Sequence, residues 1–505
     1  MAVSLSRREL LKLSGLSMLG LLAACAPKVI KETVIVEKPV ERVVEKEKEV
    51  TKIVEKEKEV TKIVEKQKVV TATPAPPQKV KIYAYDYIAE DATGTSAWDR
   101  LKQQRFAEAF PEIEVEHNPF PQMQHEQSMP WLMTALASDD GPHYHRMDAE
   151  MFTYDLAALG AVAYLDDYLP LYYPEWDDLM EVVQDVSKYG GKVVQIPGMV
   201  ETEGLVFRRD YQEAAGYDPG FVPTTWDEML KLCKALTTEE HSGFQTAQVA
   251  WAFYCLLWMN GGSEVLEHED KTITTHFTAP EVLETAKFYR DLAYVHKVWR
   301  GNLQADIAET LQVFQGGKSA MYNFMPSWFN WMFGKATFKP EQLNFLSWPV
   351  GPSGAAGKSM LAPWVNVGTH SWLVASKRPA AERDAAARYI CWMNSKKNII
   401  KEAEWWRENG LQGVYASPFK DVPWDTVSSG VPKWWGPQLK TILGYGRRSP
   451  APAAHQTVRA YREKAIQDIL LSADSDIEGI MRSTEARFKA EFLDDYHAKL
   501  KSKSG

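Results

Sequence analysis

Residues 79–85 read KVKIYAY, and their apolar side chains alternate with polar ones as in a β-strand. Residues 98–110 follow with apolar side chains at helical spacing, and Pro111 ends this predicted helix. Residues 113–116 (IEVE) alternate again. A strand, a helix and a strand in this order predict a βαβ unit with a parallel sheet. The body of the chain, residues 79–505, is therefore predicted to be α/β.

Further helices are predicted along the body. Residues 225–228 (TWDE) form a capping box that opens a helix through Leu236. Helices are also expected from Pro379 to about Asn394, over 458–473, and in the charged last 30 residues. Strands and helices that alternate over this length fit two α/β lobes better than one.

Composition excludes several classes of protein. The chain has 505 residues, of which 45% are hydrophobic and 25% charged, which is ordinary for a globular protein and excludes wholesale disorder. The net charge is −9, from 58 basic and 67 acidic residues. Nucleic-acid binders normally carry a strong basic field, so no nucleic-acid partner is expected.

The first 25 residues have the pattern of an export signal. Arg7 and Arg8 precede a weakly apolar stretch, residues 13–24, which is too short to span a bilayer as a helix. Residues 22–25 (LAAC) resemble a bacterial lipobox, in which Cys25 is lipidated. The paired arginines resemble a twin-arginine signal, and a general secretion signal is the alternative. We expect an exported protein, held by lipid at the outer face of the cytoplasmic membrane.

Residues 26–78 are predicted to be a low-complexity charged tether. The stretch VEKEKEVTKI at 44–53 recurs identically at 54–63. Its apolar positions fit neither a heptad nor an 11-residue repeat, so no coiled coil is supported. A Pro-rich junction at 71–78 follows. The segment cannot bury a core, and its expected role is that of a spacer.

No catalytic, metal or cofactor motif stands out in the body. Cys233, Cys255 and Cys391 lie among apolar neighbours and are predicted to be buried thiols, with no disulfide framework. Residues 316–319 (GGKS) resemble the end of a P-loop, but Gln312 replaces the first required glycine. The pair His143 and His145 does not by itself make a metal site. We therefore predict no catalytic residues, no metal and no cofactor, and a protein that is not an enzyme.

Several motifs, in a shared order, resemble one family across nearly the whole body. This family comprises the extracellular solute-binding proteins of carbohydrate-importing ABC transporters, and it includes the maltose-binding proteins. The motifs are, in chain order, 191–197 (GKVVQIP) with 204–210 (GLVFRRD), 224–230 (TTWDEML), 258–262 (WMNGG), 314–328 (FQGGKSAMYNFMPSW) and 372–394.

The resemblance implies the type II periplasmic-binding-protein fold, in which two discontinuous lobes are joined by crossing strands. The implied boundaries are a first lobe of 79–200 and 343–377 and a second lobe of 201–342 and 378–505. It also implies the partners, which are a saccharide ligand in the cleft and the membrane-embedded permease subunits of an ABC importer.

A sugar needs aromatic rings for its C–H faces and polar groups for its hydroxyls. Of the 18 Trp residues, fourteen follow residue 250, so the second lobe is expected to supply most of the rings. Asp86 and its neighbours directly follow the first strand, where open α/β sheets place their ligands. The candidate ligand-binding residues are Tyr85, Asp86, Tyr87, Asp148, Trp258, Trp328, Trp364, Asn366 and Tyr415.

Two other functions stay open at this point. A surface-tethered polysaccharide hydrolase would also use export and a Trp-rich groove. Alternatively, the same fold binds a solute that is not a sugar, such as a polyamine or a peptide. The acidic body fits a cationic ligand, since residues 1–70 carry a net +4 and the rest of the chain −13.

Overall fold

The computed structural model describes residues 79–86, 95–119, 131–136, 138–148, 150–246, 249–325, 328–363, 365–411, 416–428, 430–433 and 435–504. The chain divides after Thr73 into two units, and all described residues belong to the second. The predicted signal peptide, the lipidation site Cys25 and the tether lie outside the described residues.

The predicted βαβ unit is confirmed. Strand β1 (Val80–Ala84) pairs in parallel with β2 (Ile113–His117), and helix α2 (Thr95–Ala109) lies between them in sequence. Alternation decides which side chains enter the core, because Ile82 and Ala84 are fully buried while Lys81 is exposed.

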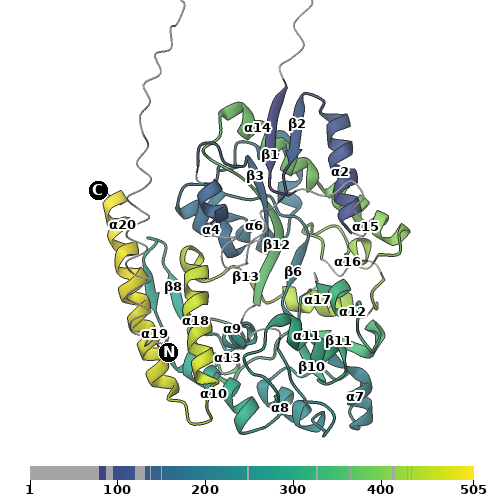
Figure 1. Cartoon of the computed structure of the whole chain (residues 1–505), viewed down its shortest axis with the longest axis vertical. Helices are drawn as coiled ribbons and strands as arrows, with labels where there is room; N and C mark the ends of the chain where they lie inside the picture. Colours follow the sequence, from purple (N-terminus) through teal and green to yellow (C-terminus); the bar gives the residue numbers. More distant parts are fainter. Residues whose placement is uncertain are drawn as a thin grey trace, which may run out of the picture. The chain divides into compact units, whose positions relative to one another are not determined.

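One long strand, β12 (Val365–Val374), connects the two halves of the fold (Figure 1). Its last five residues pair antiparallel with β3 (Tyr144–Asp148). Its middle pairs antiparallel with β6 (Val200–Thr202), and its first two residues pair in parallel with β13 (Gly446–Arg447). A third segment joins this junction where Val200 and Ala416 exchange backbone hydrogen bonds of 3.0 and 3.1 Å. These contacts form the set of crossing strands that the two-lobed fold requires.

The first lobe contains two helices that the predicted boundaries gave to the second. Helix α14 (Ala380–Met393) packs on β1 and α2, and α15 (Lys396–Glu408) packs on α2. The prediction ended the first lobe at residue 377, so it needs correction here. The chain re-enters the first lobe along β12, and α14 and α15 both belong to that lobe before the chain continues into the second lobe.

The second lobe is built around a three-stranded antiparallel sheet. Strand β7 (Gly204–Arg208) is central, with β10 (Met321–Phe324) and β11 (Leu343–Leu346) on either side. The predicted boundaries placed residues 343–346 in the first lobe, and this pairing corrects that assignment. Its helices include α7 (Arg209–Ala214), α8 (Trp226–Ala235), α9 (Val249–Met259), α10 (Pro280–Tyr294) and α11 (Ile307–Gln315).

The capping box at the start of α8 is present as predicted. The Glu228 backbone N–H donates to Thr225 Oγ1, and the Thr225 N–H donates to Glu228 Oε2, both at 3.3 Å. The helix ends at Ala235, one residue before the predicted end.

The C-terminal part is helical. Its elements are α17 (Trp435–Leu443), α18 (His455–Ile469), α19 (Ile477–Phe488) and α20 (Asp494–Ser504). The predicted helix over 458–473 corresponds to α18, which begins three residues earlier and ends at Ile469. Helix α18 packs on α9 and α19.

The remaining elements are short. The strands are β4 (Lys188–Tyr189), β5 (Lys192–Val193), β8 (Val265–Glu267) and β9 (Ile273–Thr275). The helices are α4 (Glu150–Ala158), α5 (Leu169–Tyr172), α6 (Glu181–Val186), α12 (Phe329–Phe333), α13 (Pro352–Ala355) and α16 (Trp424–Val427), with 3-10 turns at Pro174–Asp178, Pro340–Gln342 and Pro452–Ala454 and a π turn at Lys489–Leu493.

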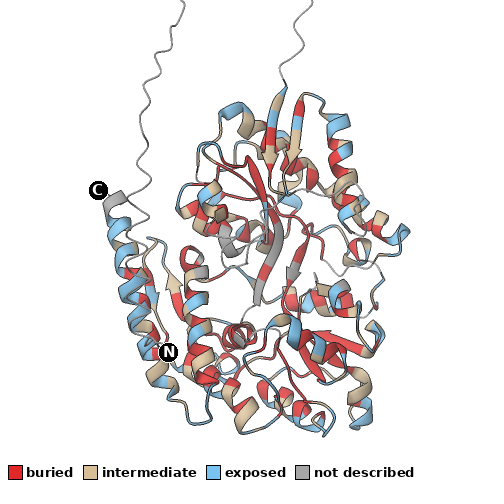
Figure 2. Cartoon of the chain, viewed as in Figure 1, coloured by how far each residue is buried: buried red, intermediate tan, exposed pale blue. Residues whose placement is uncertain are grey.

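Burial follows the amphipathic pattern of the elements. Figure 2 shows buried residues along the strands and on the inner faces of the helices, and exposed residues along α19 and α20. Cys233, Cys255 and Cys391 are buried free thiols, as predicted. Within the described ranges, no helix is long and apolar enough to cross a membrane.

Candidate functional site

A cavity of about 170 Å³ lies at the junction of the crossing strands. Gly198 and Met199, which directly precede β6, form one wall, and Trp372 of β12 forms another. The other walls come from the first lobe, since α2, β3, α15 and the end of α14 supply Ser96, Asp99, Lys102, Arg146, Asn394, Ile399, Glu402 and Trp406.

The polar wall of this cavity is a network of ionic side chains. Lys102 is buried, with its Nζ 2.9 Å from Glu402 Oε2 and 3.3 Å from Asp99 Oδ1. Burial by itself would lower the pKa of Lys102, but Glu402 and Asp99 outweigh it and raise that pKa. Arg146 is half exposed, with its Nη1 3.5 Å from Asp99 Oδ2. The wall therefore offers fixed charged donors and acceptors.

The apolar wall consists of two tryptophans. Trp372 stacks on Tyr144 with ring centroids 5.9 Å apart, and Trp406 is 3% exposed. The neighbouring Trp405 instead packs against Trp98, at 5.8 Å between centroids. Successive residues of a helix point in different directions, so only one member of this pair reaches the cavity.

Asp86 directly follows β1, as expected, but its carboxylate is hydrogen-bonded to other residues of the protein. Asp86 Oδ1 lies 2.6 Å from Nδ1 of His117, and the Tyr144 hydroxyl donates to Asp86 Oδ2 at 3.4 Å. Its neighbour Tyr85 is half-buried and packs edge-on against Trp131, at 4.9 Å between centroids. Asp86 thus links the end of β1 to His117 of β2 and Tyr144 of β3.

The two described tryptophans among the predicted ligand-binding residues differ in environment. Trp258 is 2% exposed and packs against Tyr254 of its own helix, at 4.3 Å between centroids, so it belongs to the core of the second lobe. Trp328 is half-buried and stands edge-on between Trp251, at 5.1 Å, and Trp331, at 5.9 Å. Trp331 is 45% exposed, so this aromatic cluster reaches the surface of the second lobe.

The other predicted residues are only partly described. The backbone of Asp148 pairs with His370, and that of Asn366 pairs with Arg447, which places both residues in the crossing sheet. Their side chains lie outside the described part of the structure, as do the residues Tyr87, Trp364 and Tyr415.

The main polar residues of the cavity were not predicted from the sequence. Lys102 and Asp99 lie on one face of α2, three residues apart, which is a signal for a side-chain pair. Glu402 and Trp406 also share a helix face at a spacing of four. Their placement opposite α2 follows only once α15 is assigned to the first lobe.

Two motifs that the sequence singled out have structural explanations. Residues 316–319 connect the end of α11 to β10, whereas a P-loop leads from a strand into a helix. His143 accepts a hydrogen bond from the Tyr83 N–H at 3.0 Å, and its Nε2 lies 2.8 Å from Glu382 Oε2, so it holds β1 and α14 together.

Two lobes joined by crossing strands, with a cavity at the junction, define a two-lobed binding protein. The chain belongs to the bacterial extracellular solute-binding proteins, whose family model matches residues 103–418. It is therefore an exported binding protein and not an enzyme, as predicted.

Similar solved structures show the same fold. One is the ABC substrate-binding protein Lmo0181 of Listeria monocytogenes in complex with cycloalternan, with a TM-score of 0.64 and 18% identity over 82% of this chain and 99% of the other. Another is T. maritima MalE3 bound to maltose, with a TM-score of 0.63 and 18% identity over 82% and 100%. A third is UgpB of Mycobacterium tuberculosis in complex with glycerophosphocholine, with a TM-score of 0.64 and 16% identity over 83% and 99%.

Proposed function

We propose that the protein captures a carbohydrate between its lobes and delivers it to an ABC importer. The observation that carries this proposal is the cavity at the crossing strands, which combines an ionic wall with tryptophan rings. Hydroxyl groups need fixed donors and acceptors, and the C–H face of a pyranose needs an aromatic ring. Relatives of the same fold that bind cycloalternan or maltose support this ligand class.

Delivery to an importer follows from the mechanics of the fold. Ligand contacts made by both lobes favour the closed state only when they are stronger in that state. Trp372 of β12 lines the cavity, and the lining residues Gly198 and Met199 lead directly into β6, so a ligand there contacts the segments that join the lobes. A transporter that binds the closed form then distinguishes loaded protein from empty protein.

We further propose that the protein is a lipoprotein held at the outer face of the cytoplasmic membrane. Residues 1–25 would be a twin-arginine signal peptide with Cys25 as the lipidated residue, and residues 26–78 would be the spacer. Mass spectrometry of the protein from its native membrane tests this. A mature chain that starts at a diacylated Cys25 supports the anchor, and an unmodified chain that starts elsewhere contradicts it.

A thermal-shift screen tests the ligand class. We expect maltodextrins or other saccharides to raise the unfolding temperature, and calorimetry to give a dissociation constant near 1 μM, which is about −8 kcal/mol. The same plate includes a polyamine, a peptide mixture and glycerophosphocholine, the ligand of UgpB. Stabilisation by one of these, with none by any saccharide, would overturn the carbohydrate assignment.

A further inference from the structure

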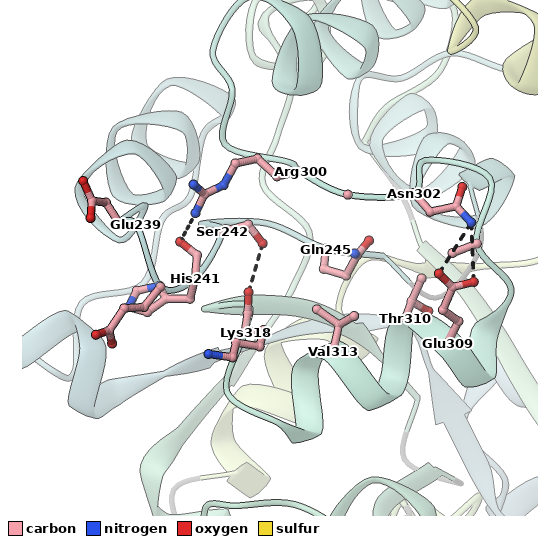
Figure 3. A pocket seen from close by; sticks show the side chains of 13 residues that line it. Glu239, His241, Ser242, Gln245, Arg300, Asn302, Glu309, Thr310, Val313 and Lys318 are labelled. Atoms are coloured by element: carbon pink, nitrogen blue, oxygen red, sulfur yellow. Dashed lines mark hydrogen bonds between the residues drawn. The ribbon is translucent and has the colours of Figure 1, made fainter.

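A second cavity, of about 370 Å³, lies within the second lobe (Figure 3). None of its lining residues borders the cavity at the crossing strands. They come from the segment after α8, the segment after Trp299, helix α11 and the residue Lys318. The size is at the lower end of the range for small-molecule sites, about 300 to 1,000 Å³.

The decisive residue in this cavity is Gln245, whose amide orientation is fixed. Gln245 is 3% exposed, and its Oε1 accepts hydrogen bonds from Trp299 Nε1 and from the Thr246 N–H, both at 2.9 Å. Two N–H donors require the oxygen at that position, so the NH₂ group must occupy the other.

The amide nitrogen of Gln245 is left without an acceptor. Among the described residues, Nε2 forms no hydrogen bond, and Gln245 lines the cavity. Figure 3 shows its side chain near the middle of the lining residues. Because the rest of the side chain is buried and held in place, this N–H group offers the cavity a fixed donor for an acceptor on a ligand.

The rim of the cavity carries charges of both signs. Lys318 is exposed and forms no ion pair with any described residue, while Arg300 Nη2 donates to the carbonyl oxygens of Thr238 and His241, each at 2.5 Å. Glu239, Glu240 and Glu309 also line the cavity and supply negative charge. Asn302 Nδ2 donates to Glu309 Oε1 at 3.5 Å and to Oε2 at 3.4 Å, and each carboxylate oxygen can accept a further hydrogen bond.

We propose that this cavity binds a small zwitterion of the α-amino-acid type. Its carboxylate accepts from Gln245 and lies near the cations Lys318 and Arg300, and its ammonium group faces the glutamates. A simple cation cannot satisfy the Gln245 donor. A pyranose lacks a stacking surface here, since no Trp, Tyr or Phe is among the described lining residues. This site is separate from the proposed saccharide site.

Calorimetry on the full-length protein tests the proposal with L-alanine, L-lysine and L-glutamate, each measured against acetate and methylamine. We expect at least one amino acid to bind, and acetate and methylamine to bind at least tenfold more weakly. Saturation with the saccharide found in the thermal-shift screen leaves this binding unchanged. Absence of heat with all three amino acids, or competition by the saccharide, overturns the proposal.

Substitutions in the cavity test whether the amino acid binds there. Gln245→Glu keeps the acceptor for Trp299 but replaces the free donor with an anion, and we expect affinity to fall at least tenfold. Lys318→Gln changes an exposed side chain and is expected to weaken binding about fivefold. The matched control, Lys231→Gln, removes another exposed charge, on α8, and leaves affinity unchanged. Equal affinity of Lys318→Gln and Lys231→Gln overturns the assignment, whether or not Gln245→Glu folds.

Discussion

At the scale of single residues, Lys102 shows how the candidate site is held in shape. Its ammonium is buried between Glu402 and Asp99, so each carboxylate compensates a charge that would otherwise be costly to bury. The two partners lie on different helices, α15 and α2. The ion pair therefore both charges the cavity wall and fixes α15 against the start of the first lobe.

Replacing Glu402 by Gln tests this role. The change leaves Lys102 buried with one carboxylate, and we expect the free energy of unfolding to fall by about 3 kcal/mol in urea denaturation. We also expect saccharide affinity to fall at least tenfold. Glu404→Gln, on the exposed face of the same helix, is the control and should stay within about 0.5 kcal/mol of the parent protein. Equal stability of the two variants would show that the buried pair does not stabilise the lobe.

Glu203 is the residue whose protonation we expect to be visible near neutral pH. It lies between β6 and β7, where Tyr254 Oη donates to its Oε1 and Cys255 Sγ to its Oε2, both at 2.6 Å. Burial raises the pKa of Glu203 to about 7, although the hydrogen bonds from Cys255 and Tyr254 and the charge of Arg459 oppose this rise.

The expected pH dependence follows from that shift. In the unfolded chain Glu203 titrates near its ordinary value of 4.5, so between pH 4.5 and 7 the native state binds more protons. Its contribution to stability is therefore complete below about pH 4.5 and is lost as the pH rises through 7. The stability of the parent protein minus that of Glu203→Gln should fall by about 2.5 kcal/mol between pH 5 and pH 8. The exposed substitution Glu213→Gln serves as control, and a flat difference would contradict the assignment.

The sequence predicts the positions of individual side chains least completely. Motif position predicts Trp258 as a stacking ring; the structure packs it against Tyr254, and it does not line the cavity at the crossing strands. A family motif identifies the turn on which a residue lies, but not which side of the helix faces the cavity. Trp406 lines the cavity and Trp405 does not. Which of the two rings reaches the cavity depends on how α15 packs on α2.

At the scale of elements, the local patterns predicted structure well. The β1–α2–β2 unit and the capping box of α8 depend on residues close in sequence, and both are confirmed. The lobe boundaries depend on pairing between distant segments. Strand β11 pairs with β7, and helix α14 packs on β1. The chain therefore passes from one lobe to the other at positions that no local sequence pattern indicates.

Gly204 allows strands β7 and β11 to approach closely. A Cβ atom added there would lie 2.6 Å from the backbone oxygen of Leu346 and 2.6 Å from the ring of Phe345. The backbone oxygen cannot move without breaking the pairing of β7 with β11, so we expect Gly204→Ala to lower the free energy of unfolding by about 2 kcal/mol. The control is Gly220→Ala, where the nearest contact is 3.3 Å to the side chain of exposed Asp218. Chemical denaturation that gives equal values for the two variants would exclude this packing constraint.

At the scale of the whole molecule, the uneven distribution of tryptophan has a different meaning from the one expected. Fourteen of the 18 Trp residues follow residue 250, but several of these belong to the first lobe. Trp372 stacks on Tyr144, Trp405 packs against Trp98, and Trp392 packs against Phe106 at 5.5 Å. The chain returns to the first lobe late in the sequence, so position along the chain does not assign a ring to a lobe. The expectation that the second lobe supplies most of the rings is corrected for these three.

Net charge gives a last test of the ligand class. Residues 71–505 carry a net −13, which would attract a cationic solute through the field of the whole protein. A neutral saccharide is insensitive to that field, since its binding depends on short-range hydrogen bonds and ring contacts. We therefore expect the dissociation constant for the saccharide to change less than twofold between 20 and 500 mM NaCl. A polyamine in the same cavity would lose affinity by tenfold or more over this range, because its attraction is screened beyond about 4 Å at the higher salt. Titration calorimetry at both salt concentrations separates the two ligand classes, and a steep salt dependence of the tightest ligand would exclude a neutral sugar.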